Sequence, residues 1–175
     1  VAVNIPPQQL HKGDLIDVLQ QALHDSGLAA SQLEVELTET SLMEDPELAI
    51  EIFGQIRAMG MTIALDDFGT GYSSLSQLRR FPLDTLKIDQ AFVRDIGHCT
   101  EDGAIVRAII TMAHQLGMTV VAEGVETAEH LEFLTHERCD YVQGYHISRP
   151  VPAEQMEAML RAQQATMASP AAKAH

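Results

Sequence analysis

The sequence predicts an α/β protein whose strands form a parallel sheet or a (βα) barrel. Short runs of β-branched and aliphatic residues recur along the chain, and amphipathic segments of helical period separate them. Apolar strands that alternate with helices are typical of parallel sheets covered on both faces. The expected strands are VAVN (1–4), LEVE (33–36), TIALDD (62–67), DTLK (84–87), TVVAE (119–123) and DYVQ (140–143).

Helices between these strands are indicated by capping residues and by glycines. Asp45 is a favourable N-cap, and Pro46 follows it in the first turn. The amphipathic segment that starts there ends at Gly60, a second ends at Gly117, and an earlier one ends near Gly27. Weaker helices are expected after Ser73, Thr127 and Pro152.

Two stretches of the chain resemble each other and support this division into units. Residues 60–66 read GMTIALD and residues 117–123 read GMTVVAE, so in both a glycine, a Met-Thr start and a final carboxylate recur. We count about six βα units, fewer than the eight that close a barrel. Either about two units precede Val1 in a longer natural protein, which we favour, or a partner chain completes the sheet. We expect one domain over 1–164 and a flexible tail over 165–175.

The composition argues against several classes of function. Acidic residues number 25 and basic residues 11, a formal net charge of −14. Such a surface repels polyanions, so we expect no contact with nucleic-acid polymers or anionic membranes, although metal ions can bring a phosphate ligand to it. Cys99 and Cys139 lack metal-ligand spacing and indicate free thiols in a reducing compartment, and no secretory or membrane-spanning segment is recognisable. We therefore expect a cytoplasmic domain, although another segment can anchor the natural protein in a membrane.

Oxygen-bearing side chains stand at the ends of predicted strands that are far apart in the sequence. Asp66 and Asp67 end one strand, and Asn4, Glu36 and Glu123 end three others. Because the carboxyl ends of parallel strands share one rim, these groups are expected to converge there. Neighbouring carboxylates repel each other when both are ionised, unless a cation lies between them. Carboxylate and amide oxygens are ligands that Mg²⁺ and Mn²⁺ prefer. The set suffices for two metal ions that share a bridging carboxylate, as in phosphoryl chemistry.

The plain alternative is that each acid merely ends a strand where a loop begins. The whole set argues against it, because polar groups on loops of a rigid scaffold usually carry function. Lys87 can position a water molecule or neutralise a phosphate oxygen at this rim, or it can be solvated or paired with Asp89. Glu123 can serve as ligand or general base, with Glu126 supporting it.

The segment FGTGYSS follows the paired aspartates. It lacks the third glycine of a dinucleotide-binding loop and the lysine of a P-loop. Adjacent side chains in a strand point to opposite faces, so both aspartates can reach one site only where the strand gives way. We expect a mobile loop beside the metals that supplies this break, with the residues Phe68, Gly69, Thr70 and Gly71.

Taken together, the motifs resemble those of the EAL domain, the bacterial cyclic-di-GMP phosphodiesterase family. They are VNIPPQQL, ELTET, IALDDFGTGYSSLSQL, LKIDQAFV, VVAEGVE and YVQGYHISRP, and they extend from Val1 to about Leu160. The resemblance implies a modified TIM-type barrel with one antiparallel strand, incomplete in this chain. It also implies hydrolysis of one phosphodiester of cyclic di-GMP to linear pGpG with two Mg²⁺ or Mn²⁺ ions.

The resemblance assigns roles to individual residues. Metal ligation is implied for Asn4, Glu36, Asp66, Asp67 and Glu123, and Glu123 is alternatively the general base. Lys87 matches the lysine that holds the nucleophilic water, Glu126 the glutamate that steadies the DDFGTG loop, and Gln143 a polar contact at the site.

Two departures from the family pattern stand out. Pro6 replaces the usual serine, which changes the backbone after Asn4 but removes no ligand. The Glu-Ala-Leu motif itself, whose glutamate is a metal ligand, would lie upstream of Val1. We therefore expect this chain alone to bind metal poorly and to turn over slowly.

Three functions remain open at this point. The first is a cyclic-di-GMP phosphodiesterase, which the intact DDFGTG and AEGVE motifs favour. The second is a non-catalytic cyclic-di-GMP receptor or protein-interaction module on the same barrel, and the third is a different metal-dependent barrel hydrolase. The resemblance further implies a homodimer and an upstream regulatory or diguanylate-cyclase-like domain in the natural protein.

Overall fold

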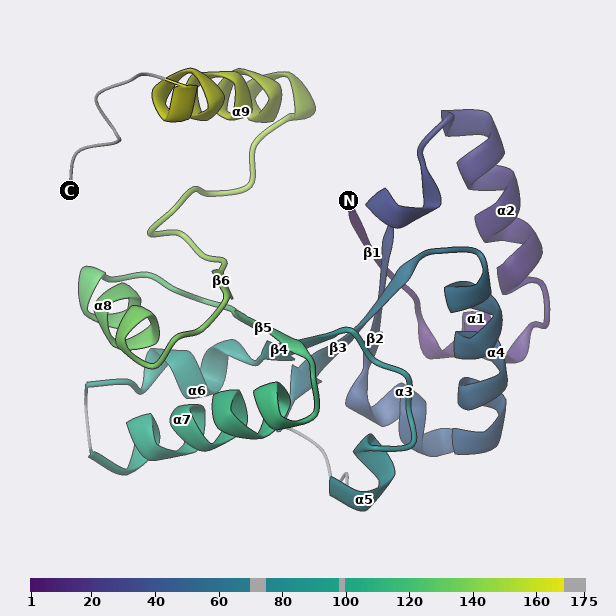
Figure 1. Cartoon of the computed structure of the whole chain (residues 1–175), viewed down its shortest axis with the longest axis horizontal. Coiled ribbons are helices and arrows are strands. Elements are labelled where there is room, and N and C mark those ends of the chain that lie inside the picture. The colour runs from purple at the N-terminus through teal and green to yellow at the C-terminus, as the bar shows by residue number, and fades with distance from the viewer. Residues whose placement is uncertain (70–74, 98–99, 169–175) are drawn as a thin grey trace.

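The computed structural model describes residues 1–69, 75–97 and 100–168. Six strands form one sheet in the order β1-β2-β3-β4-β5-β6, and every neighbouring pair is parallel. The strands are β1 (Ala2–Asn4), β2 (Glu34–Thr38), β3 (Thr62–Phe68), β4 (Thr85–Ile88), β5 (Thr119–Ala122) and β6 (Tyr141–Val142). All six predicted strands are confirmed, and the sheet is a curled, incomplete (βα) barrel (Figure 1).

Helices follow the strands along the chain. They are α1 (Pro7–His11), α2 (Leu15–Ser26), α3 (Glu39–Glu44), α4 (Pro46–Ala58), α5 (Leu75–Leu78), α6 (Gln90–Arg94), α7 (Thr100–Gln115), α8 (Ala128–His136) and α9 (Ala153–Ala168), with a 3-10 turn η1 (Ala30–Gln32). The sequence predicts α2, α4, α5, α7, α8 and α9, whereas α1, α3, α6 and η1 are too short to show a hydrophobic period. Figure 1 shows α1, α2 and α4 on one flank of the sheet and α6, α7 and α8 on the other.

The core lies between the sheet and these helices. α4 packs on β3, and α7 packs on β4 and β5. The side chains at these contacts are fully buried, including Phe53, Ile56, Ile63, Leu86 and Val106. The ring of Phe53 also meets that of Phe81 edge to face, with ring centroids 6.0 Å apart. Burial of these side chains makes the sheet a rigid scaffold for the residues at its rim.

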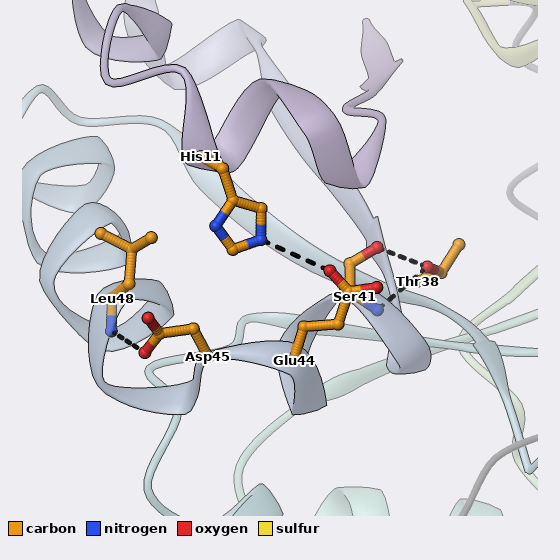
Figure 2. Close-up of polar contacts among 6 residues, drawn as sticks. All are labelled: His11, Thr38, Ser41, Glu44, Asp45 and Leu48. Carbon is orange, nitrogen blue, oxygen red and sulfur yellow. Dashed lines mark hydrogen bonds and ion pairs between the residues drawn. The ribbon is translucent and has the colours of Figure 1, made fainter.

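Side-chain caps fix the connection from β2 to α4 (Figure 2). Thr38 ends β2, and its Oγ1 accepts a 3.4 Å hydrogen bond from the backbone N of Ser41 at the start of α3. The predicted cap of α4 is confirmed, because Asp45 Oδ1 accepts from the backbone N of Leu48 at 3.1 Å. These caps satisfy helix N–H groups that have no partner within the helix.

The two similar stretches of sequence make the same structure at the amino ends of β3 and β5. Gly60 and Gly117 have φ of 93° and 78°, the left-handed geometry that ends a helix. The aspartate that directly precedes the next strand then accepts a backbone N–H near the start of each: Asp84 Oδ2 accepts from Ile63 N at 3.0 Å, and Asp140 Oδ2 accepts from Val120 N at 2.8 Å. A basic side chain of the preceding helix joins each carboxylate, Arg57 at 3.4 Å from Asp84 and His114 at 2.8 Å from Asp140.

The C-terminal segment stands apart from the rest of the molecule in Figure 1. α9 is exposed along residues 153–164, and it continues to Ala168, about one turn beyond the boundary that the sequence predicts for the tail. Residues 169–175 lie outside the described part of the chain. Cys139 is a free thiol as expected, whereas Cys99 is outside the described residues. None of the described helices combines the length and hydropathy needed to cross a bilayer.

Candidate metal centre

The acidic side chains meet around one lysine inside the carboxyl-end rim of the sheet. Lys87 Nζ lies 3.0 Å from Glu36 Oε1, 3.0 Å from Asp66 Oδ1 and 2.7 Å from Glu123 Oε1. These four residues come from β2, β3, β4 and the end of β5, which are separated widely in the sequence. The predicted spatial convergence is therefore confirmed for this group.

Glu36 and Lys87 lie within their strands rather than at the strand ends that the sequence predicts. β2 continues through Leu37 to Thr38, and β4 continues to Ile88. Leu37 and Ile88 are buried, so the apolar run extends beyond the polar residue. Alternation along a strand sends successive side chains to opposite faces, which directs Glu36 and Lys87 to the opposite face from these apolar neighbours. Both are only about 5–6% exposed.

A β-bulge explains how two adjacent aspartates reach one site. Leu65 pairs with Leu86 and Phe68 with Ile88, so β3 has one residue more than β4 over this interval. Asp67 has φ of 54°, in the left-handed region that aspartate tolerates better than most residues. The sequence predicts this break at the glycines of the loop. The structure corrects this, because β3 continues to Phe68 and the irregularity lies at the aspartates themselves.

Three carboxylates are close enough to share a cation. Ligand oxygens of Asp66, Asp67 and Glu123 all lie within 4.8 Å of one another. Hard carboxylate oxygens of this kind fit Mg²⁺ or Mn²⁺ and not the sulfur and imidazole sets of structural zinc sites. The donor set thus agrees with the metals that the sequence implies, and Glu36 on the neighbouring strand β2 lies 3.0 Å from the same ammonium as Asp66 and Glu123.

The electrostatics of the cluster are unbalanced. Burial opposes the charge of Lys87, but hydrogen bonds with Glu123, Glu36 and Asp66 outweigh it and hold the pKa of the ammonium above its ordinary value. Burial raises the pKa of Glu123, and repulsion from Asp66 and Glu36 works in the same direction against the attraction of Lys87. Burial and the charge of Asp66 likewise raise the pKa of Asp67. The single ammonium does not compensate this many carboxylates, so bound cations would relieve the repulsion.

Asn4 stands at the margin of the cluster. It ends β1, the first strand of the sheet, and pairs in register with Glu36 on β2. Parallel strands in register present paired residues on the same face, so its amide lies beside the glutamate. Asn4 is exposed, in contrast to Glu36.

Gln143 and Glu126 border a hollow next to Glu123. The hollow has a volume of about 220 Å³, and its other lining residues are Gln90, Gly124, Gly144 and Tyr145. The backbone of Gln143 holds the loop after β5, because its carbonyl accepts from Val125 N at 3.0 Å. Three of the predicted site residues therefore share one polar recess at the rim.

Glu39, which the sequence does not single out, holds the backbone of Gly69 directly after β3. Glu39 is 2% exposed, and its Oε2 accepts a 3.1 Å hydrogen bond from Gly69 N. The resemblance implies this task for Glu126, and that role stays a prediction. The backbone N of Glu126 donates a 3.4 Å hydrogen bond to His130 Nδ1. The position of Glu39, directly after β2 and three residues beyond Glu36, was the available signal. Phe68 ends β3, and the predicted residues Thr70 and Gly71 lie outside the described part of the chain.

Comparison with known proteins places these features in a family. A family model described as the EAL domain matches residues 1–150. The cyclic di-GMP phosphodiesterase NbdA of Pseudomonas aeruginosa is 46% identical over 170 residues, which are 97% of this chain and 22% of NbdA. This chain therefore spans about a fifth of the length of that relative.

Solved structures agree in fold. The PaMucR phosphodiesterase in its c-di-GMP complex matches with a TM-score of 0.85 and 44% identity, over 89% of this chain and 63% of the other. The manganese/c-di-GMP complex of Klebsiella pneumoniae BlrP1 matches with a TM-score of 0.79 and 39% identity, over 85% of this chain and 38% of the other. The chain belongs to the EAL domain family, and its six parallel strands are part of the TIM-like barrel of that family.

Proposed function

We propose that this chain carries a cyclic-di-GMP phosphodiesterase site that uses two divalent cations, Mg²⁺ or Mn²⁺, and yields linear pGpG. The observation that carries the proposal is the contact of Lys87 Nζ with three carboxylates from three other strands. The names of NbdA and PaMucR support the reaction, and the manganese complex of BlrP1 supports a divalent cation.

Bound cations would act as Lewis acids on the attacking and leaving oxygens of an in-line displacement at phosphorus. Asp66, Asp67 and Glu123, whose oxygens lie within 4.8 Å of one another, would hold such cations, with Glu36 and Asn4 as further oxygen ligands. This arrangement needs side-chain oxygens from several strands at once, and the buried scaffold supplies them in fixed positions.

The chain's own proton donors and acceptors account for the rest of the reaction. Lys87, whose Nζ lies 2.7 Å from Glu123 Oε1, would hold the attacking water beside that carboxylate. Glu123 accepts a proton from that water. The water oxygen forms the new bond to phosphorus, the bond from phosphorus to the ribose 3′ oxygen breaks, and that oxygen takes up a proton. The products are one phosphomonoester and one hydroxyl, which is linear pGpG.

The test is hydrolysis of cyclic di-GMP with Mg²⁺ or Mn²⁺, followed by chromatography of pGpG. We expect Asp66→Asn and Glu123→Gln to lower the rate by more than about 100-fold, since each removes an oxygen that touches the reacting centre. Glu132→Gln, at an exposed carboxylate of α8, is the matched control and should match the unaltered chain. Binding of cyclic di-GMP without turnover, in this chain and in one extended at its N-terminus, would favour the receptor alternative.

We also propose that the domain forms a homodimer, functions in the cytoplasm and is joined to a regulatory or diguanylate-cyclase-like domain. The relative MucR of Pseudomonas aeruginosa bears the name of a bifunctional diguanylate cyclase and phosphodiesterase, which supports the last point. The mass of the chain in solution, measured by light scattering, tests the dimer.

A further inference from the structure

The short helix α6 lies between Gly69, which follows the paired aspartates of β3, and Gly124, which follows Glu123. On one side, Gly69 has φ of +100°, and a Cβ at this position would lie 2.6 Å from Cε2 and 2.8 Å from Cζ of Phe92. Real Cβ atoms do not come so close, so the backbone after Asp66 and Asp67 rests directly on the Phe92 ring. The contact requires glycine, both for the left-handed backbone and for the space.

The other side of α6 makes a contact of the same kind. Gly124 has φ of +69°, and a Cβ there would lie 2.5 Å from Cβ and 3.2 Å from Cα of Gln90. This glycine directly follows Glu123 at the end of β5. The backbone that bears Glu123 is therefore seated against the first turn of α6, with no room for a side chain between them.

α6 is itself anchored to the sheet. Asp89 Oδ1 accepts from the backbone N of Ala91 at 2.7 Å and so caps the helix. Val93 is fully buried in the core, and Ile96 is 5% exposed. Lys87, at the centre of the cluster, lies on β4 just before the cap. The helix is thus fixed to the same strand that presents the lysine.

We propose that α6 is a spacer that sets the separation between the carboxylates at the end of β3 and the carboxylate at the end of β5, with Phe92 and Gln90 as positioning residues. Neither side chain needs to touch a cation or the substrate. Each acts through a glycine next to a ligand, Phe92 through Gly69 and Gln90 through Gly124. The inference rests on the proposed function in one respect, namely that these carboxylates bind divalent cations.

Metal geometry makes this spacing important. Mg²⁺ requires oxygen ligands at about 2.0–2.1 Å in near-octahedral arrangement, so a small shift of one loop separates ligands that a cation must join. The backbone at Gly69 and the backbone at Gly124 each contact α6 so closely that not even a Cβ would fit between them. The two loops therefore cannot move closer together while α6 lies between them. Loss of the ring of Phe92 would open a space beside Gly69, and α6 would then shift toward Gly69 and away from Gly124.

The first experiment measures Mn²⁺ binding by calorimetric titration for the unaltered chain, Phe92→Ala and Phe92→Leu. We expect Phe92→Ala to weaken Mn²⁺ binding by about tenfold or more, as is usual when groups that orient ligands are lost. Phe92→Leu, which keeps a large apolar side chain, should retain most of the Mn²⁺ affinity. The matched control is Phe133→Ala. Phe133, like Phe92, is partly buried and packs on a glycine, since a Cβ at Gly103 would lie 3.0 Å from its ring, but it belongs to α8.

The outcomes separate the two proposals. If Asp66→Asn abolishes Mn²⁺ binding and Phe92→Ala leaves it unchanged, the spacer is wrong and the metal site stands. If neither the unaltered chain nor a chain extended at its N-terminus binds Mn²⁺, the metal site is wrong, and the proposed role of α6 in metal binding is wrong with it. If Phe133→Ala weakens binding as much as Phe92→Ala, the effect is general destabilisation, which also overturns the spacer.

A second experiment needs no metal. Phe92 contacts Gly69 on one side of α6, so a spacer transmits its loss to Gly124 on the other side. We expect Phe92→Ala to shift the backbone amide resonance of Gly124 in the metal-free chain, and Phe133→Ala to leave it in place. An unmoved Gly124 resonance in folded Phe92→Ala contradicts the inference.

Discussion

The two ends of the sheet use carboxylates in opposite ways. At the amino end, Asp84 and Asp140 each accept a backbone N–H and pair with a basic side chain. At the carboxyl end, Lys87 is, within the described residues, the one basic side chain within ion-pair distance of Glu36, Asp66 and Glu123. Satisfied carboxylates stabilise the fold. Raised pKa values such as those of Asp67 and Glu123 are instead typical of a site that binds cations or performs chemistry.

Among the substitutions considered, replacement of Lys87 should cause the largest loss of stability. Lys87→Met leaves buried carboxylates without their cation, and loss of one partner of a buried ion pair costs about 3–5 kcal/mol. We expect a loss of this size in the free energy of unfolding of the metal-free chain at neutral pH, measured by urea denaturation. Lys12→Met, at an exposed lysine, is the control.

Urea denaturation of Lys87→Met in the presence of Mn²⁺ tests the same prediction further. A cation that binds the folded chain alone stabilises it, so Mn²⁺ should restore part of the loss in Lys87→Met. If Lys87→Met is as stable as the unaltered chain without metal, the carboxylates do not depend on the ammonium and the comparison fails.

Asp67→Asn should separate stability from function. Asparagine accepts the left-handed backbone of this position and carries no charge, so the repulsion with Asp66 is removed. We expect the metal-free chain to gain about 0.5–1 kcal/mol, in the range of common stabilising substitutions. Hydrolysis should fall by more than about 100-fold because a carboxylate ligand is lost. Thermal unfolding and pGpG formation measure the two effects, and a destabilised Asp67→Asn would contradict the electrostatic account.

Asp140→Ala should weaken the amino end without changing the site. It removes the acceptor for Val120 N and the partner of His114, and a buried donor left unpaired costs about 1–3 kcal/mol. Urea denaturation should show a loss of this order. Mn²⁺ affinity should stay within about twofold, since independent sites do not couple. A large loss of Mn²⁺ affinity would mean that the two ends are not independent.

The smallest effect is a difference in pH dependence between the ends. Burial opposes ionisation of Asp140, but the hydrogen bonds from His114 and Val120 N outweigh it and lower its pKa. Asp140 therefore stabilises the fold above the ordinary aspartate pKa of about 3.9, and this contribution disappears as the pH falls through its lower value in the fold. The pKa of Asp67 is raised, so its charge costs stability above that raised value, and the cost disappears as the pH falls to about 3.9.

Metal-free unfolding titrations of the two asparagine variants measure this difference. Asp140→Asn should be less stable than the unaltered chain at pH 7, and Asp67→Asn more stable. Both differences should shrink as the pH approaches 3. Differences of the same sign at pH 7 would refute the contrast between the ends.

The sequence predicts the scaffold well because each strand is an apolar run bounded by a helix stop or a cap. Asp45 and Gly117 mark such boundaries without any knowledge of tertiary contacts. The polar residue in each run also identified Glu36, Lys87 and Glu123 as residues of one rim, because the topology of parallel strands directs them there.

What the sequence could not predict depends on relations between strands. The bulge at Asp67 arises from the register between β3 and β4, which no local pattern encodes. The role of Glu39 depends on the approach of the loop after β3 to the end of β2, a contact between residues 30 positions apart. The contacts of Gly69 and Gly124 with α6 likewise appear only when the loops are packed.

The most direct test of the central claim is a crystal structure of the chain grown with Mn²⁺, with anomalous diffraction measured at the manganese absorption edge. The account predicts anomalous peaks among the oxygens of Asp66, Asp67 and Glu123, with Lys87 close by. Manganese bound only elsewhere on the acidic surface, with these carboxylates paired to Lys87 alone, would contradict it.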